Sequence, residues 1–149
     1  MKDREPVNML TEVSIKRPTV RQMMVLGYWI AMMSGGDDES DICGLCHILL
    51  NRAIEAIEHI TRYKSPHPIY GSGGWLEVCV ECCPEQIDFD QAFTNVHAQT
   101  IAAFCHILTG RGSDPTFGAT LFHKHWIEPE WAATARPTSS AFNLMFYRP

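Results

Sequence analysis

The chain has 149 residues, a length that fits one domain with a single hydrophobic core. Hydrophobic residues make up 46% of the sequence and charged residues 19%, a composition that excludes a disordered protein. The net charge of −5 and the pI near 5.7 disfavour binding to nucleic acid or to anionic membranes, so neither is expected as a partner.

The sequence predicts neither a membrane span nor a secretion signal. The longest apolar run, from Met23 to Met33, is shorter than the ~20 residues that a membrane span needs, and Gly27 interrupts it. The amino end lacks the apolar segment and the cleavage site of a signal peptide. We therefore expect synthesis in the cytoplasm without a signal peptide.

Residues 1–16 show no periodicity and are expected to form an extended arm, followed by one domain over residues 17–149. A first helix is expected to start near Pro18, which suits a first helical turn, and to continue with apolar residues at helical spacing. The run Ser34-Gly35-Gly36 should end this helix.

A second helix is expected from about Ile42 to Tyr63, because a wide apolar stripe runs through this segment. Its start is preceded by residues that cap helices and place negative charge at the positive end of the helix dipole. These residues are Asp37, Asp38, Ser40 and Asp41.

The segment that follows is predicted to be a loop over residues 64–74, which is rich in proline and glycine. Residues 75–90 are ambiguous, since Leu76, Val78 and Val80 alternate like a short strand that Pro84 would end. A third helix is expected from a cap at Asp90 to Leu108, closed by Gly110.

The last part of the chain predicts a small β element. A strand is expected near residues 119–123, then a loop through Pro129 and Pro137, then a strand over residues 143–147 that could pair with the first. Helices followed by short strands indicate an α+β domain that is mostly α, with three main helices and a short C-terminal β element.

The cysteines leave alternatives open. Cys43 and Cys46 form one Cys-x-x-Cys pair, and Cys79 and Cys82 form another, a pattern typical of zinc ribbons. However, the spacer is longer than in most ribbons, and the first pair lies in a predicted helix. Buried free thiols are therefore the favoured interpretation, and structural zinc or a disulfide within residues 79–83 are the alternatives.

Several short motifs follow one another in a characteristic order. They are Leu49-Leu50-Asn51-Arg52; Ala98, Ile101, Ala102, Leu108 and Gly110; Asp114-Pro115-Thr116 with Gly118-Ala119; Phe122-His123; Pro129-Glu130-Trp131-Ala132; Thr134-Ala135-Arg136; and Phe146-Tyr147-Arg148. Together they resemble the spore-cortex-lytic or cell wall hydrolase family, whose members cleave the glycan strands of peptidoglycan. The resemblance covers about residues 20–148 and implies a small lysozyme-like domain over residues 17–149.

Two positions depart from the family. Counted back from Asn51 without a gap, the catalytic glutamate of the family falls on Met33, whose thioether cannot donate a proton to a glycosidic oxygen. The histidine that precedes the closing Phe-Tyr of the family falls on Leu144. These two replacements favour a relative that keeps the fold without the activity.

An acid close to the lost position remains available. One gap in the alignment would bring Glu39 into the catalytic place, so Glu39 is the expected general acid. Glycan cleavage requires a carboxylic acid that an apolar pocket keeps protonated. The alternative is that Asp37, Asp38 and Glu39 simply cap the second helix.

Five residues are expected to bind the glycan: Tyr28, Asn51, His123, Trp126 and Tyr147. Aromatic rings can stack on sugar faces, although packing within the core is an equal alternative for each. Asn51 could instead tie loops to its helix. His123 and His125 are two residues apart on a predicted strand, so they could line a groove or bind a metal, or His123 could simply hydrogen-bond the backbone.

The first hypothesis is therefore cleavage of peptidoglycan, by a hydrolase or a lytic transglycosylase of phage or prophage origin, with no cofactor and no metal. Without a signal peptide, it would reach the cell wall through a holin or as part of a virion or another carrier particle. The second hypothesis is a degenerate relative that binds glycan or serves as a structural component of a particle. The third is a cysteine-based zinc protein used for interaction.

Overall fold

The computed structural model describes residues 15–36, 38–81, 95–109 and 113–149. These residues form helices α2 (Val20–Ser34), α3 (Glu39–Tyr63) and α4 (Asn95–Leu108), then strand β1 (Leu121–Lys124), the 3₁₀ helix η3 (Glu130–Ala133), and strands β2 (Arg136–Ser140) and β3 (Leu144–Arg148). The expected α+β domain, mostly α and with a short C-terminal β element, is confirmed. Among the described helices, none is long and apolar enough to cross a membrane.

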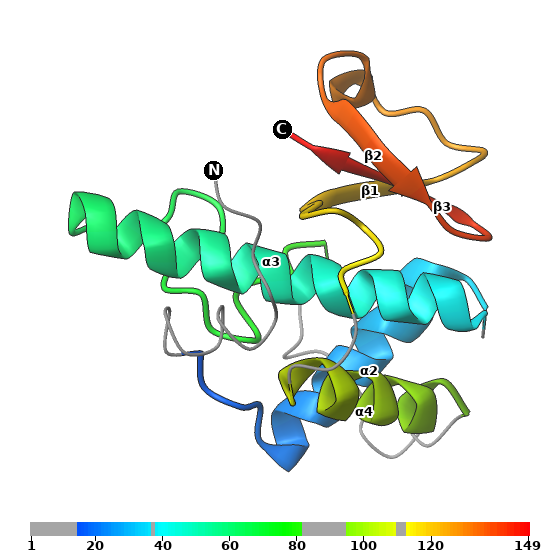
Figure 1. Ribbon diagram of the computed structural model, residues 1–149, viewed down its shortest axis with the longest axis horizontal. Helices are drawn as coiled ribbons and strands as arrows, with labels where there is room; N and C mark the ends of the chain where they lie inside the picture. Colours follow the sequence, from blue (N-terminus) through cyan, green and yellow to red (C-terminus); the bar gives the residue numbers. More distant parts are fainter. Residues whose placement is uncertain (1–14, 37, 82–94, 110–112) are drawn as a thin grey trace.

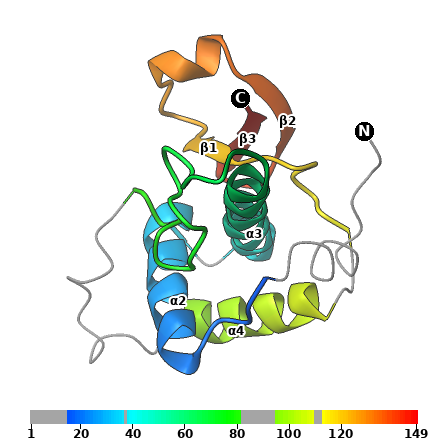
Figure 2. The ribbon, with the colours of Figure 1, turned by 90° about the vertical axis from the view of Figure 1, so that its left-hand side faces the viewer.

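Helix α3 forms the middle layer of the domain. The three-stranded sheet lies over the N-terminal half of α3, and α2 and α4 pack on the opposite side (Figure 1). The view along α3 shows the same order of layers, with the sheet on one side of the helix and α2 and α4 away from it (Figure 2). The helix is therefore buried along most of its N-terminal half.

The helix boundaries follow from local capping. The Thr19 hydroxyl accepts the backbone N–H of Gln22, and the Gln22 side chain accepts the Thr19 N–H in return, so Pro18 precedes the cap of α2 rather than starting its first turn. Gly35 ends α2 with a φ of 69°. Asp38 caps α3 by accepting the backbone N–H groups of Ser40 and Asp41.

Some expected features lie outside the described residues. These are most of the extended arm over residues 1–16, the cap residue Asp37, the strand-ending Pro84, the expected cap Asp90 and the closing Gly110. The described part of the third helix, α4, ends at Leu108 as expected.

The sheet has the order β1-β3-β2 with antiparallel pairing. The predicted pairing of the first and last strands is confirmed, and Phe122 lies opposite Phe146. Strand β2 was missed, because its polar sequence with Pro137 predicted a loop. Since β2 is an edge strand with an irregular register between Pro137 and Ser139, a proline is tolerated there.

The suggested strand around Leu76–Val80 is wrong. Residues 75–78 form a turn in which the Val78 N–H donates to Gly74 O, and the Cys79 thiol donates to Trp75 O. Val78 is fully buried, whereas Leu76 and Val80 are exposed. Of the three alternating apolar residues, only Val78 is buried, and it anchors the turn to the core.

One close contact sets the distance between the sheet and α3. A Cβ atom added at Gly44 of α3 would overlap the Phe146 ring of β3. Phe146 belongs to the single core that α2, α3, α4 and β3 share, together with Trp29, Leu45, Leu49, Phe104 and Leu144. Glycine inside a helix costs about 1 kcal/mol relative to alanine, and here it allows the sheet to approach the helix backbone.

We expect Gly44→Ala to destabilise the fold by about 1–3 kcal/mol despite the better helix propensity of alanine, because the methyl group overlaps the Phe146 ring. Chemical denaturation of the single variant, of Phe146→Leu and of the double variant measures the coupling. Gly36→Ala is the control, since its Cβ would meet Asn143 Nδ2 only at 3.9 Å. If Gly44→Ala costs as much in the Phe146→Leu background as alone, the contact is not the constraint.

Candidate functional site

An open cleft of about 450 Å³ lies between the start of α3 and the β2–β3 end of the sheet. Its lining residues are Asp38, Glu39, Ser40, Cys43, Pro115, Ser140, Ala141 and Phe146. Glu39, the expected general acid, therefore borders a cleft, but its side chain is exposed. None of the five expected glycan-binding residues lines this cleft.

The place where the family resemblance puts the catalytic acid is a different junction, between the end of α2 and the ends of β1 and β3. Asn143 Nδ2 donates to Ser34 O at 3.3 Å, and a Cβ at Gly35 would lie 3.2 Å from Lys124 Nζ. Met33 packs partly buried against the core, and Leu144 is fully buried. Met33 and Leu144 thus contribute apolar packing at this junction.

His123 and Tyr147, two of the residues expected to bind glycan, lie in contact with each other. Their side chains are joined by a 2.8 Å hydrogen bond and stack at 5.1 Å, and Trp131 of η3 packs edge-on against both rings. His123 Nδ1 also bonds Lys124 O, so Nδ1 carries the proton and the Tyr147 hydroxyl donates to Nε2. The hydrogen bond to the backbone, which was the alternative to a site role for His123, is present.

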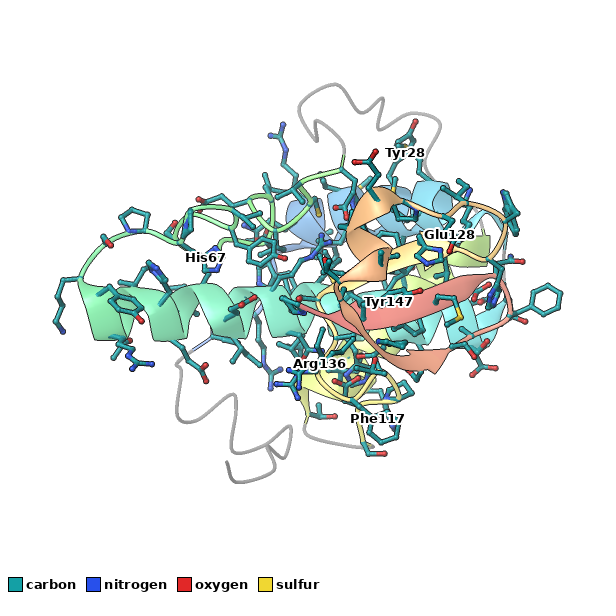
Figure 3. All side chains as sticks on the ribbon, turned by 90° about the horizontal axis from the view of Figure 1, so that it is seen from above. Tyr28, His67, Phe117, Glu128, Arg136 and Tyr147 are labelled. Atoms are coloured by element: carbon teal, nitrogen blue, oxygen red, sulfur yellow. The ribbon has the colours of Figure 1, made fainter. Side chains whose placement is uncertain are left out.

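This aromatic cluster (His123, Trp131 and Tyr147) lies on the face of the sheet away from α3. Along β3, Phe146 packs on α3, so the neighbouring Tyr147 points to the opposite face. Figure 3, viewed from above the sheet, shows Tyr147 over the sheet with Tyr28 towards one edge of the molecule. Tyr28, on α2, is half-buried and does not join the cluster in this view.

Trp126 follows β1 and is 66% exposed. The Lys124 ammonium lies over its ring, 5.7 Å from the centroid. The neighbouring turn carries Phe142, which is 71% exposed, and the two turns are joined by the His125 N–H donating to Asn143 O at 3.0 Å. Phe142 and Lys124 were not predicted from the sequence, because single exposed aromatic or charged residues are common on protein surfaces.

Asn51 is buried and ties a loop to α3. Its amide donates to Asp114 Oδ2 and to Ala119 O, both at 2.9 Å. Burial would raise the pKa of Asp114, but the neighbouring His47 and the hydrogen bonds from Thr116 and Asn51 lower it overall. Burial lowers the pKa of His47, partly opposed by the neighbouring Asp114 carboxylate.

Arg52 has a similar role for two other segments. Its guanidinium donates to Thr120 O and Val78 O at 2.9 Å each and forms a forked pair with Glu81. Asn51 and Arg52 therefore hold loops against the helix rather than facing the cleft.

The thiols of α3 are poor nucleophiles. Burial and the carboxylates of Asp114 and Glu39 raise the pKa of Cys43, and Cys46 is fully buried. Cys82 lies outside the described residues, so the second expected pair is incomplete there. Within residues 15–36, 38–81, 95–109 and 113–149, no group of three or more His, Cys, Asp or Glu side chains is arranged to hold a metal.

Comparisons of this chain with protein-family models, with curated proteins and with solved structures give no match.

Asp41 is a buried acid that the sequence suggested only as a cap residue. Its carboxylate accepts the Asn143 N–H at 2.9 Å, while its second oxygen is buried without a partner among the described residues. Burial raises the pKa of Asp41, partly opposed by the Asn143 hydrogen bond, and Asp38 and His125 are the nearby charged groups that act on it. Compared with the unfolded state, the folded state therefore favours the protonated form of Asp41 more strongly.

We expect Asp41→Asn to raise the melting temperature at pH 7 by a few degrees. Because folding raises the pKa of Asp41, the wild type loses stability as pH rises from about 4 through the folded pKa, and the variant should lack this loss. Thermal unfolding from pH 4 to pH 8 tests it. Asp38→Asn is the control, since hydrogen bonding to Ser40 lowers the pKa of Asp38. Lower stability of Asp41→Asn at every pH would contradict the expectation.

We expect Asn51→Asp to cost about 3 kcal/mol or more at pH 7, because it places a second buried carboxylate against Asp114. Asn51→Leu, which removes the donor without adding charge, should cost about 1–3 kcal/mol. Urea denaturation at pH 7 and pH 4 separates the loss of the donor from the added charge. The difference in free energy of unfolding between the two variants should be smaller at pH 4. An equal cost of both variants at pH 7 would refute a charge effect.

Proposed function

We propose that this protein binds the glycan strands of peptidoglycan without cleaving them, as a degenerate lysozyme-like relative of the cell wall hydrolases. The observation that carries the proposal is the junction between α2 and the sheet. Met33 and Leu144, which occupy the positions of the catalytic acid and of a histidine in the resemblance, pack against or within the core there. Neither side chain can donate a proton to a glycosidic oxygen.

The surface beside this junction retains features suited to sugars. Trp126 and Phe142 are exposed on adjoining turns, and flat aromatic faces stack on the apolar faces of pyranose rings. Lys124 adds a hydrogen-bond donor beside Gly35. Because position 33 has no acid while Trp126 and Phe142 remain exposed, glycan binding is favoured over glycan cleavage.

Cleavage by Glu39 is the second candidate, because Glu39 lines an open cleft together with Asp38. Two observations weigh against it. Glu39 is exposed, whereas a general acid works best in an apolar enclosure, and Asp38 is engaged in capping α3.

We expect purified protein to co-sediment with peptidoglycan sacculi and to release no fragments that mass spectrometry can detect. Trp126→Ala should weaken co-sedimentation about tenfold or more, because it removes the stacking surface. Phe117→Ala is the matched control, since Phe117 is 68% exposed on the separate loop before β1.

Digestion assays with Glu39→Gln decide between the two candidates. Release of reducing ends or anhydro-muropeptides by the wild type, lost in Glu39→Gln, would establish an enzyme and overturn the proposal. If well-folded protein shows neither binding to peptidoglycan nor release of fragments, both candidates are refuted.

A further inference from the structure

The lysine on the aromatic surface lacks an acidic partner within the described residues. Among the described residues, His47 pairs with Asp114, Arg52 with Glu81 and His67 with Glu55, whereas Lys124 belongs to none of these pairs. The chain has 17 acidic residues against 12 lysines and arginines. The Lys124 ammonium is therefore available to pair with a negatively charged group of a ligand.

The Lys124 ammonium lies between the Trp126 ring and the end of α2. Its ammonium lies 5.7 Å from the centre of the Trp126 ring, and its Nζ approaches the backbone of Gly35, where an added Cβ would come within 3.2 Å. A ring and a cation in contact match a sugar that carries a carboxylate, since the ring can cover the pyranose while the ammonium pairs with the acid.

We propose that Lys124 binds the lactyl carboxylate of N-acetylmuramic acid, so that this surface prefers glycan strands from which the stem peptides have been removed. In strands that carry stem peptides, the lactyl carboxyl is an amide and has no charge. Removal of the peptide exposes one carboxylate on every second sugar, next to the pyranose that Trp126 would cover. This inference rests on the proposed glycan binding and adds the chemical group that the surface distinguishes.

Phe142 extends the same surface. It is 71% exposed on the turn that accepts the His125 N–H through Asn143 O, next to the turn that carries Trp126. Two rings on adjoining turns provide stacking for more than one sugar, so a strand should bind better than a single disaccharide. In this arrangement, Lys124 distinguishes strands with a free lactyl carboxylate from strands without one, and the rings of Trp126 and Phe142 provide the contact area.

Binding is measured by calorimetry with three soluble probes: peptide-free glycan strands, strands that retain their stem peptides, and chitin oligosaccharides, which have the same linkage without a lactyl group. The wild type should bind peptide-free strands about tenfold more tightly than the other two, as expected for one charge-assisted hydrogen bond. Lys124→Gln should remove this preference, Lys124→Arg should keep most of it, and Trp126→Ala should weaken binding to all three.

Lys16→Gln is the charge-matched control, because Lys16 is exposed and precedes α2. Equal binding of Lys124→Gln and the wild type to peptide-free strands would overturn the carboxylate contact while leaving glycan binding intact. If the wild type prefers strands with stem peptides, the carboxylate that Lys124 binds belongs to the peptide. This result would also overturn the proposed contact with the lactyl carboxylate. Absence of binding to every probe would refute the proposed function itself.

Discussion

The structure depends on two neighbouring polar side chains in the middle of its longest helix. Asn51 and Arg52 place an amide and a guanidinium where the turn over residues 75–81 and the loop before β1 approach α3, and they satisfy backbone carbonyls of both. A buried carbonyl without a partner costs about 1–3 kcal/mol, so these segments can lie against the helix only because the donors are present. The entry of the chain into the sheet is thereby fixed.

That anchoring determines which chemistry each end of the sheet can support. The start of β1 is held to α3 through Thr120, while its far end carries Lys124 beside the end of α2. An acid at position 33 would have lain at this junction, and a methionine there adds to the core instead. Trp126 lies on the turn after β1 and Lys124 at the end of that strand, and both lie outside the core, so the packing requirement at position 33 does not apply to them.

The sequence predicted features that local patterns encode. The apolar stripes gave the helices, Asp38 was among the expected caps, and the pairing of β1 with β3 followed from two short apolar runs. Strand β2 could not be predicted, because Pro137 is acceptable only at an edge and nothing local shows that β2 is one. The expected site was dispersed for a similar reason: His123 and Tyr147 meet across paired strands, whereas Glu39 and Asn51 face other surroundings that only the packing of distant segments defines.

The glycine at position 44 has a consequence for the way in which the chain folds. A helix that carries glycine near its start, and polar side chains in its middle, depends strongly on tertiary contacts in that half. Its compensation comes from Phe146 and from Asp114, Ala119 and Thr120, which follow much later in the sequence. Because such distant contacts must close long loops before they stabilise anything, the N-terminal half of α3 and the sheet should become ordered together, late and cooperatively, rather than as a preformed helix that the sheet then joins.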